Sequence, residues 1–331
     1  DIFRDYYSLR GFLDQSFNQL ENVMVMDNWE NGRAFVGLFA DEMATTDNSS
    51  AVFTLHSGNW LSNAKSNTTF EIGNGGSTAI SRSYKALRIN NRIINDIDKA
   101  PLTPEQKNEI LGQAYFYRSW FYFQIIKRYG GMPIIDKVFE GGDDDIPRMT
   151  YHESHDWMME DIQKAIYMLP DSWDDPNYGR PTKIAAMALK EWAQLFDASP
   201  LMQNDLNSTE NKGYDTERAK SAAKSAYEVI RYMDGSKSAP YPYGLASKEE
   251  YTNVFYFKYP PVHQPEYIWV KRQFPNAANQ NQKRTIRTFW QYEDLAFGSG
   301  PDGNSMCCPS LNIVNMFDKK AGMTGTAQTE E

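Results

Sequence analysis

The sequence feature that most restricts the fold is a strong helix start at Thr103, which is followed by a long apolar stripe. Thr103 can cap a helix, Pro104 suits the first helical position because no donor is needed there, and Gln106 can complete a capping box. The residues that follow share one stripe at helical spacing: Ile110, Ala114, Tyr117, Phe121 and Ile125. Gly130-Gly131 ends the pattern, and Pro133 prevents the helix from resuming. The pattern therefore predicts one long helix between Thr103 and Gly130.

Other segments show the same helical periodicity, and several carry their own start and stop signals. They are residues 3–20, 80–97, 150–170, 182–198 and 215–235. Thr150 with Glu153 forms a second capping box, Asp215 can cap the last segment, and Pro170 and Gly235 mark helix ends. Small residues let neighbouring helices approach closely, as in tetratricopeptide repeats: Ala114, Ala185, Ala188, Ala222 and Ala226. We therefore predict a mainly α fold of tetratricopeptide-like helical pairs, although the roughly 34-residue period of those repeats is absent.

Two regions of the chain lose the helical pattern. Residues 30–78 are rich in Asn, Ser, Thr and Gly, which predicts a long loop. From about Ala239 onward Pro, Tyr, Asn and Gly become frequent, and Glu266–Lys271 alternates like a short strand. We therefore expect a helical scaffold over residues 1–238 and a loop-rich subdomain with few short strands over residues 239–331. Long irregular segments on a rigid scaffold are common places for ligand binding.

The charge balance and the absence of known motifs disfavour several classes of function. Lys and Arg number 34 against 43 Asp and Glu, and this net charge of −9 disfavours nucleic acid, whose phosphates require a basic surface. No run of 18 apolar residues could form a membrane-spanning helix. The sequence lacks G-x-S-x-G, a phosphate-binding glycine loop, H-E-x-x-H and a zinc Cys pattern. We therefore predict no catalytic residues and no cofactor, although paired carboxylates for glycoside hydrolysis cannot be located by spacing alone.

Two acidic segments could in principle hold a metal ion. His152 and His155 lie three residues apart at a helix start, beside Glu153 and Asp156. The favoured interpretation is a solvated first turn whose acids complement the helix dipole. Residues 141–145 read Gly-Gly-Asp-Asp-Asp without the spacing of an EF-hand, and a solvated turn is again favoured. We therefore predict no metal site.

Aromatic residues make up 14% of the chain, which exceeds what a core usually requires. Four of the eight Trp residues fall at helical or strand positions and are expected in the core: Trp120, Trp157, Trp192 and Trp269. Trp60 and Trp290 instead lie in irregular segments, next to polar or aromatic neighbours that complete the predicted binding site: Asn59, Arg284, Arg287 and Tyr292. An indole face can stack on a sugar ring while amide and guanidinium groups bond its hydroxyls. The alternative is that both Trp residues anchor their loops onto the helices.

Residues 112–134 resemble the signature of SusD/RagB proteins. The stretch reads GQAYFYRSWFYF and continues through KRYGGMPI, an aromatic helix with Ala and Arg followed by Arg-Tyr-Gly-Gly and a Pro. Further segments resemble the family in the same order along the chain: 84–91, 169–170, 179–186, 243–245, 266–269 and 309–317. Each match is modest alone, but the ordered set from about residue 80 to residue 320 is specific.

This resemblance implies a mostly helical protein whose loop-rich face binds a nutrient, usually an oligosaccharide and sometimes a peptide. It implies a lipid-anchored protein on the extracellular face of a Bacteroidetes outer membrane, acting as a lid on a SusC-like TonB-dependent transporter, without catalysis. The lipidated Cys and signal peptide are expected before Asp1, and further residues are expected after Glu331. Three alternatives stay open: a peptide-binding lid, a protein–protein scaffold of helical repeats and a helical glycoside hydrolase.

Overall fold

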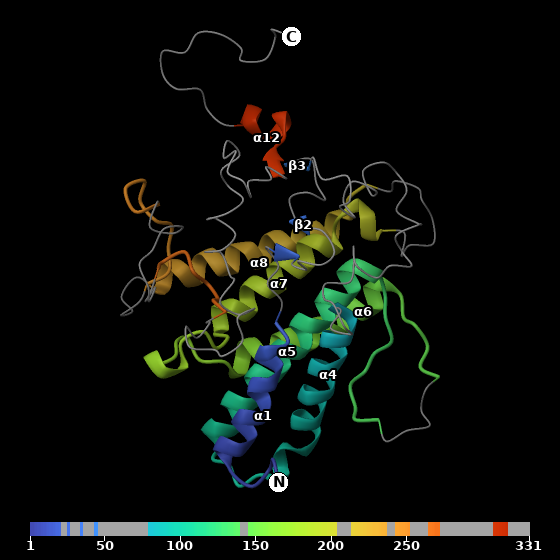
Figure 1. Ribbon diagram of the computed structural model, residues 1–331, viewed down its shortest axis with the longest axis vertical. Coiled ribbons are helices and arrows are strands. Elements are labelled where there is room, and N and C mark those ends of the chain that lie inside the picture. Colours follow the sequence, from blue (N-terminus) through green and yellow to red (C-terminus); the bar gives the residue numbers. More distant parts are fainter. Residues whose placement is uncertain are drawn as a thin grey trace, which may run out of the picture. The chain divides into compact units, whose positions relative to one another are not determined.

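The computed structural model describes most of the helical part of the chain (Figure 1). The described residues are 1–20, 79–139, 145–203, 213–236, 242–251, 264–271 and 307–316, together with short strands at 25–26, 34–35 and 43–45. The chain divides into two compact units. The first unit comprises residues 1–20 and 79–272, and the second comprises residues 21–78 and 273–331. Among the described residues, none of the helices combines the length and apolar character needed to cross a membrane.

The first unit is built from helices that follow one another in space as they do along the chain. Its helices are α1 (Tyr6–Asn18), α4 (Ala79–Asp96), α5 (Pro104–Tyr129), α6 (Tyr151–Met168), α7 (Lys183–Asp197) and α8 (Thr216–Gly235). Short 3-10 turns occur at Ile97–Lys99, Asp175–Asn177 and Pro200–Met202. From α4 to α8 each helix packs against the next, and α1 packs against α4 and α5. The prediction of a mainly α fold made of helical pairs is confirmed.

The helix boundaries follow the capping residues that the sequence contains. Thr103 accepts a hydrogen bond from the Gln106 backbone N–H, and the Gln106 side chain accepts one in return, so the predicted capping box is formed. Thr150 does the same for α6, and Asp215 accepts bonds from two backbone N–H groups at the start of α8. Gly130 ends α5 with a φ of 76°, a conformation that residues with a Cβ rarely adopt.

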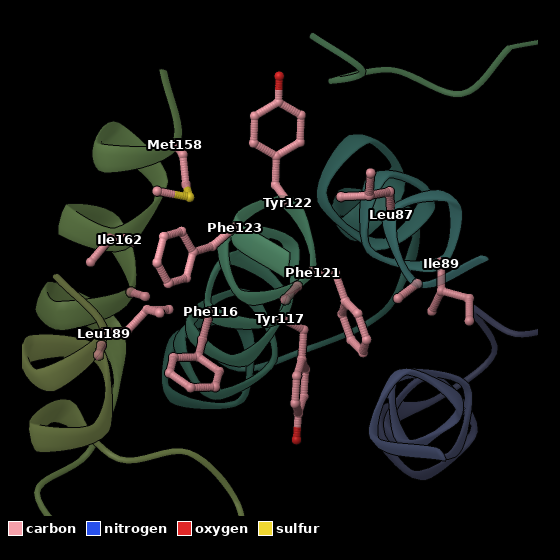
Figure 2. Close-up of a cluster of buried hydrophobic side chains, with 14 of the residues drawn as sticks. Leu87, Ile89, Phe116, Tyr117, Phe121, Tyr122, Phe123, Met158, Ile162 and Leu189 are labelled. Carbon is pink, nitrogen blue, oxygen red and sulfur yellow. The ribbon is translucent and has the colours of Figure 1, made fainter. Parts of the chain in front are cut away.

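The core of the first unit surrounds α5, as Figure 2 shows. The predicted stripe of α5 is buried, and Phe116, Tyr122 and Phe123 are buried as well, so the helix is covered on most of its circumference. Leu87 and Ile89 of α4 lie on one side of it, while side chains of α6 and α7 lie on the other: Met158, Ile162 and Leu189. Burial of this many large side chains supplies the main driving force for folding of this unit.

A buried ion pair joins α5 to α6 inside this apolar core. Arg118 donates from Nε and Nη2 to the two carboxylate oxygens of Asp161, at 2.5 and 2.8 Å. Only 5% and 2% of these two side chains are exposed. The Nη1 group of Arg118 also donates to Oδ1 of Asn91 at 2.9 Å, which links α4 to the same pair. The guanidinium lies over the Trp157 ring, so every face of this charge has a partner.

The described parts of the second unit are short strands and one short helix. Strand β1 (Val25–Met26) pairs antiparallel with β2 (Ala34–Phe35), and β3 (Met43–Thr45) pairs antiparallel with β4 (Cys307–Pro309). Helix α12 (Leu311–Met316) follows β4 directly. The described residues of the predicted loop 30–78 therefore include two short strands, β2 and β3, and the partners of both lie outside that segment.

The strand predicted at Glu266–Lys271 is not formed. The adjacent residues Ile268 and Trp269 both pack against the helical core while the backbone stays irregular, so the apolar residues of this segment serve packing and not strand pairing. The described backbone bond at the start of this segment runs from the Gly244 N–H to the Pro265 carbonyl at 3.2 Å and does not continue as a ladder. An irregular segment whose apolar side chains pack on helices can therefore resemble a short strand in sequence.

Candidate functional site

A pocket of about 200 Å³ opens on the surface of the first unit. Its walls come from the connection between α6 and α7, from the C-terminal turn of α8, and from the irregular segments 242–251 and 264–271. Six aromatic side chains contribute to the lining, and we call this site the aromatic pocket: Trp173, Tyr178, Tyr232, Tyr243, Tyr267 and Trp269. The aromatic pocket thus combines segments that are far apart in the sequence.

Both indoles of the aromatic pocket are fixed through their N–H groups. Trp173 donates to the Pro181 carbonyl at 2.8 Å, and Trp269 donates to the Gly179 carbonyl at 3.0 Å. Gly179 has a φ of 98°, so a residue with a Cβ would be strained at this turn. Because each N–H is already bonded within the wall, the indoles offer their ring carbons rather than a donor to the pocket.

Trp269 also joins the pocket to the aromatic core. Its ring meets Phe116 edge to face at a centroid distance of 4.8 Å and meets Trp120 in the same way at 4.9 Å. Both partners belong to α5, the central helix of the unit. This side of the pocket is therefore anchored in the hydrophobic core around α5.

An acidic group lies at the rim of the aromatic pocket. Asp171 Oδ1 accepts a hydrogen bond from the Tyr232 hydroxyl at 2.6 Å and lies 3.2 Å from the Lys183 ammonium. The Tyr232 hydrogen bond, aided by Lys183, lowers the pKa of the Asp171 carboxyl. Burial raises the pKa of Tyr232, Tyr243 and Tyr267. At neutral pH the pocket therefore presents one carboxylate and neutral phenols.

The remaining charged side chain in the lining, Arg180, is engaged within the protein. Its two terminal nitrogens donate to both carboxylate oxygens of Asp14 on α1, at 2.7 and 3.0 Å, and one of them also donates to Gln113 Oε1 at 3.0 Å. Asp171 is the one carboxylate among the described residues that line the pocket. These residues can stack on a ring and bond its hydroxyls, but they do not provide the two facing carboxylates of a glycosidase.

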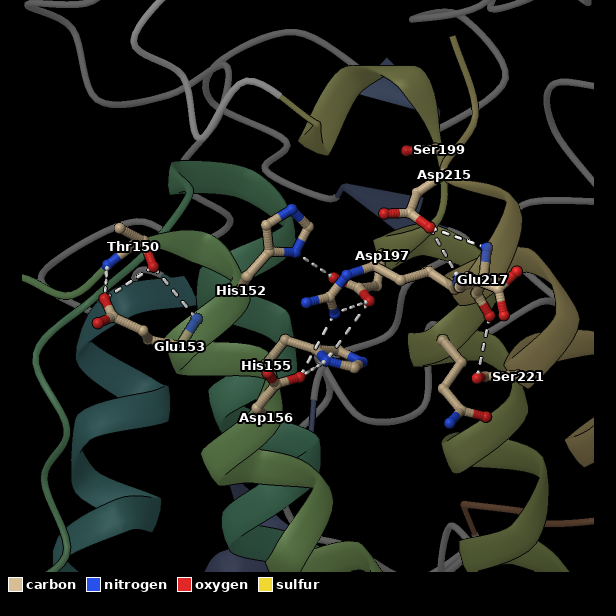
Figure 3. A network of polar contacts seen from close by, with 12 residues as sticks. Thr150, His152, Glu153, His155, Asp156, Asp197, Ser199, Asp215, Glu217 and Ser221 are labelled. Atoms are coloured by element: carbon tan, nitrogen blue, oxygen red, sulfur yellow. Dashed lines mark hydrogen bonds and ion pairs between the residues drawn. The ribbon is translucent and has the colours of Figure 1, made fainter. Parts of the chain in front are cut away.

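A second polar cluster ties together α6, α7 and α8 (Figure 3). His152 Nδ1 lies 2.8 Å from Asp197 Oδ1, and Arg218 binds both Asp197 and Asp156. The hydrogen bond with His155, together with the Arg218 charge, lowers the pKa of Asp156. Asp197 is 2% exposed and His155 is 3% exposed, so the predicted solvated turn is wrong for His155. Its partner, Asp197, lies on another helix and could not be inferred from local spacing.

The geometry of this polar cluster indicates a structural role between the helices. Within the described part of the chain, no group of three or more His, Cys, Asp or Glu side chains is arranged to hold a metal ion. The acidic loop residues 141–144 lie outside the described residues. The carboxylate of Asp197 faces one cation and two imidazoles, an arrangement that satisfies a buried charge between helices.

The six residues of the predicted binding site lie outside the described residues, and their grouping stays a prediction: Asn59, Trp60, Arg284, Arg287, Trp290 and Tyr292. Among the Trp residues expected in the core, Trp120, Trp157 and Trp269 are partly buried and pack against it. Trp192 differs, because 40% of its surface is exposed at the edge of the hydrophobic core. The aromatic pocket itself was not predicted, although Trp173 and Tyr178 lie in an irregular segment and could have indicated it.

Comparison with known proteins gives consistent similarities. A SusD-like family profile described as "Starch-binding associating with outer membrane" matches residues 10–191. The SusD-like protein P38 of Formosa agariphila is 28% identical over 102 residues, which cover 30% of this chain and 20% of that protein.

Solved structures resemble the chain in fold. A SusD-like protein from Bacteroides fragilis superimposes with a TM-score of 0.53 at 23% identity, covering 78% of this chain and 43% of that one. A SusD-like carbohydrate binding protein from Bacteroides vulgatus gives a TM-score of 0.53 at 13% identity, covering 75% and 48%. The chain thus spans about half or less of these solved proteins and a fifth of the curated relative.

Proposed function

Because the chain belongs to the SusD-like family of proteins described as starch-binding and associating with the outer membrane, we propose that it captures oligosaccharides at the cell surface. The observation that carries this proposal is the family match over residues 10–191, which runs from α1 into α7 and so covers most of the helical scaffold. A rigid platform of paired helices can hold loops and aromatic side chains in place for binding.

The proposed mechanism is capture without turnover. Trp60 and Trp290 stack on sugar rings, while Asn59, Arg284 and Arg287 bond hydroxyl groups and Tyr292 adds a further ring. A stacked ring contributes on the order of 1 kcal/mol, whereas micromolar affinity needs about 8 kcal/mol. Several such contacts must therefore act together on one glycan.

The captured glycan is then passed to a SusC-like TonB-dependent transporter. The protein acts from the extracellular face of the outer membrane, held there by a lipid anchor at the N-terminal side. Tethering beside the transporter raises the local ligand concentration at the channel entrance without any increase in intrinsic affinity. The resemblance of residues 112–134 to SusD/RagB proteins supports this arrangement.

Affinity electrophoresis in gels that contain starch or other polysaccharides tests the proposed function. We expect the wild-type chain to be retarded by at least one glycan, and Trp60→Ala and Trp290→Ala to lose most of that retardation. Tyr167→Ala is a suitable control, because Tyr167 is 84% exposed on α6 and away from the proposed residues in sequence. If both Trp variants keep full retardation, the residue assignment is wrong; if no glycan retards the wild type, the proposed function fails.

Two companion measurements separate the alternatives. A peptide-binding lid would give heat with peptides in calorimetry and none with glycans. A glycoside hydrolase would release reducing sugars from a polysaccharide, whereas a binding protein leaves the amount of reducing ends unchanged.

A further inference from the structure

We infer that the aromatic pocket is a separate subsite that binds one neutral sugar ring, formed by residues other than those of the predicted site around Trp60 and Trp290. This inference rests on the proposed function, because it takes the ligand to be a glycan. It assigns a role to the connection between α6 and α7, the end of α8 and the segment 264–271.

The size of the aromatic pocket limits its occupant to a single ring. Its volume of about 200 Å³ is smaller than the roughly 300–1,000 Å³ of pockets that enclose drug-sized ligands. One pyranose at a chain end or a branch therefore fits this pocket better than an extended oligosaccharide does. The remainder of the glycan would stay outside the pocket.

The chemistry of the walls fits a pyranose. A pyranose has apolar faces of C–H groups and an equatorial belt of hydroxyls, and it needs both stacking surfaces and hydrogen-bond partners. The two indoles have their N–H groups bonded to the Pro181 and Gly179 carbonyls, so their exposed carbons suit stacking. Both described contacts of Asp171 use Oδ1, and the side chain is 69% exposed, so a ligand hydroxyl can reach the carboxylate.

The charges around the pocket favour a neutral ring over an acidic one. Arg180 is paired with both oxygens of Asp14, and Lys183 is paired with Asp171, so both of these cations already have a carboxylate partner. A uronic acid or a sulfated sugar would bring a negative charge toward the Asp171 carboxylate without gaining a cation in exchange. The charges at the rim of the aromatic pocket therefore disfavour acidic sugar rings.

The pocket is preformed by its connection to the core. Trp269 is held by ring contacts with Phe116 and Trp120 as well as by its bond to Gly179. A site that is already ordered loses little conformational entropy when the ligand binds, which matters for a ligand as small as one ring.

Saturation-transfer-difference NMR with methyl glucoside, methyl galactoside and methyl mannoside tests this inference. We expect transfer to at least one of these neutral rings and none to glucuronic acid. Tyr267→Ala should weaken binding about two- to tenfold through loss of one aromatic wall, and Asp171→Asn should weaken it about tenfold. Asp171 is exposed at its rim, so the Asn variant keeps the fold and isolates the carboxylate. Asp171→Asn should also admit glucuronic acid.

Matched variants separate this inference from the proposed function. Tyr167→Ala should leave the methyl glycoside signal unchanged. The double variant Trp60→Ala with Trp290→Ala should retain the part of the signal that Tyr267→Ala removes. A wild-type chain that is retarded by a polysaccharide yet shows no transfer to any methyl glycoside would overturn the subsite and leave the proposed function standing. Unchanged signal in both Tyr267→Ala and Asp171→Asn, or transfer to the peptide Gly-Tyr-Gly with none to the glycosides, would overturn it as well.

Discussion

Replacing Arg118 with methionine is the most informative perturbation of the scaffold. The substitution keeps a long unbranched side chain but removes the guanidinium that binds both oxygens of Asp161. Asp161 is only 2% exposed on its side chain, so its charge would be left in the core without its partner. Breaking a buried pair in this way costs about 3–5 kcal/mol of unfolding free energy. Asn91 would also lose the donor that reaches its side-chain oxygen.

That loss is large compared with the total stability of a domain, which is typically about 5–15 kcal/mol. For a unit of roughly 200 residues each kcal/mol shifts the melting temperature by about 2–4 °C, so we expect a fall of roughly 6–20 °C. Urea unfolding followed by far-ultraviolet circular dichroism measures it directly, provided the slope of the transition stays constant while the midpoint falls.

Two further variants make the measurement discriminating. Lys220→Met removes an exposed pair with Glu217, whose side chains are 67% and 80% exposed, and should cost less than about 1 kcal/mol. The double variant Arg118→Met with Asp161→Leu should recover part of the loss, because no uncompensated charge remains in the core. If Arg118→Met costs no more than Lys220→Met, the pair is not buried as described and the reasoning is refuted.

Two further predictions concern the backbone at the end of α5 and the rim of the pocket. Gly131→Ala should lower the melting temperature by several degrees or prevent folding, because a Cβ there would lie 2.1 Å from the Met149 carbonyl oxygen; Gly235→Ala, with nothing within 4 Å, is the control and should melt like the wild type. The Tyr232 hydrogen bond lowers the pKa of Asp171 below its ordinary 3.8, so the stability that this carboxylate contributes is present above pH 3.8 and is lost as the pH falls through the lower folded-state value. Melting curves of the wild type and Asp171→Asn should therefore differ at pH 7 and converge only once the pH falls below the folded-state pKa of Asp171, which lies under 3.8. A gap that persists after this carboxyl is protonated would contradict the assignment.

The sequence predicted the helices well because their signals are local. Thr103 with Gln106 and Thr150 with Glu153 act within one turn of backbone, so their spacing alone specifies where α5 and α6 begin. The stripe from Ile110 to Ile125 likewise identifies a buried face without any knowledge of what covers it. Predictions of this kind need only a few neighbouring residues.

The predictions that failed concern residues whose packing partners are distant along the chain, so local spacing could not reveal those partners. Glu266–Lys271 alternates like a strand, but Trp269 of this segment packs against α5. His155 reads as a solvated helix start because its buried partner, Asp197, is supplied by α7. The aromatic pocket joins four such distant segments, and no spacing rule relates Asp171 to Tyr232.

Contacts between residues that are distant along the chain also couple the helical scaffold to the aromatic pocket. Arg118 joins α4, α5 and α6 through Asn91 and Asp161, and Asp197 joins α6, α7 and α8 through His152 and Arg218. Each cluster satisfies a buried charge only when its helices hold one relative position, since a shift of an ångström would leave that charge without partners. Trp269 packs on α5 and Tyr232 lies in the last turn of α8, so two walls of the aromatic pocket stand on helices that these clusters join to their neighbours. Loss of either cluster should therefore loosen the aromatic pocket before it unfolds the protein. We expect Arg118→Met to reduce the saturation-transfer signal of a bound sugar ring more strongly than it lowers the melting temperature.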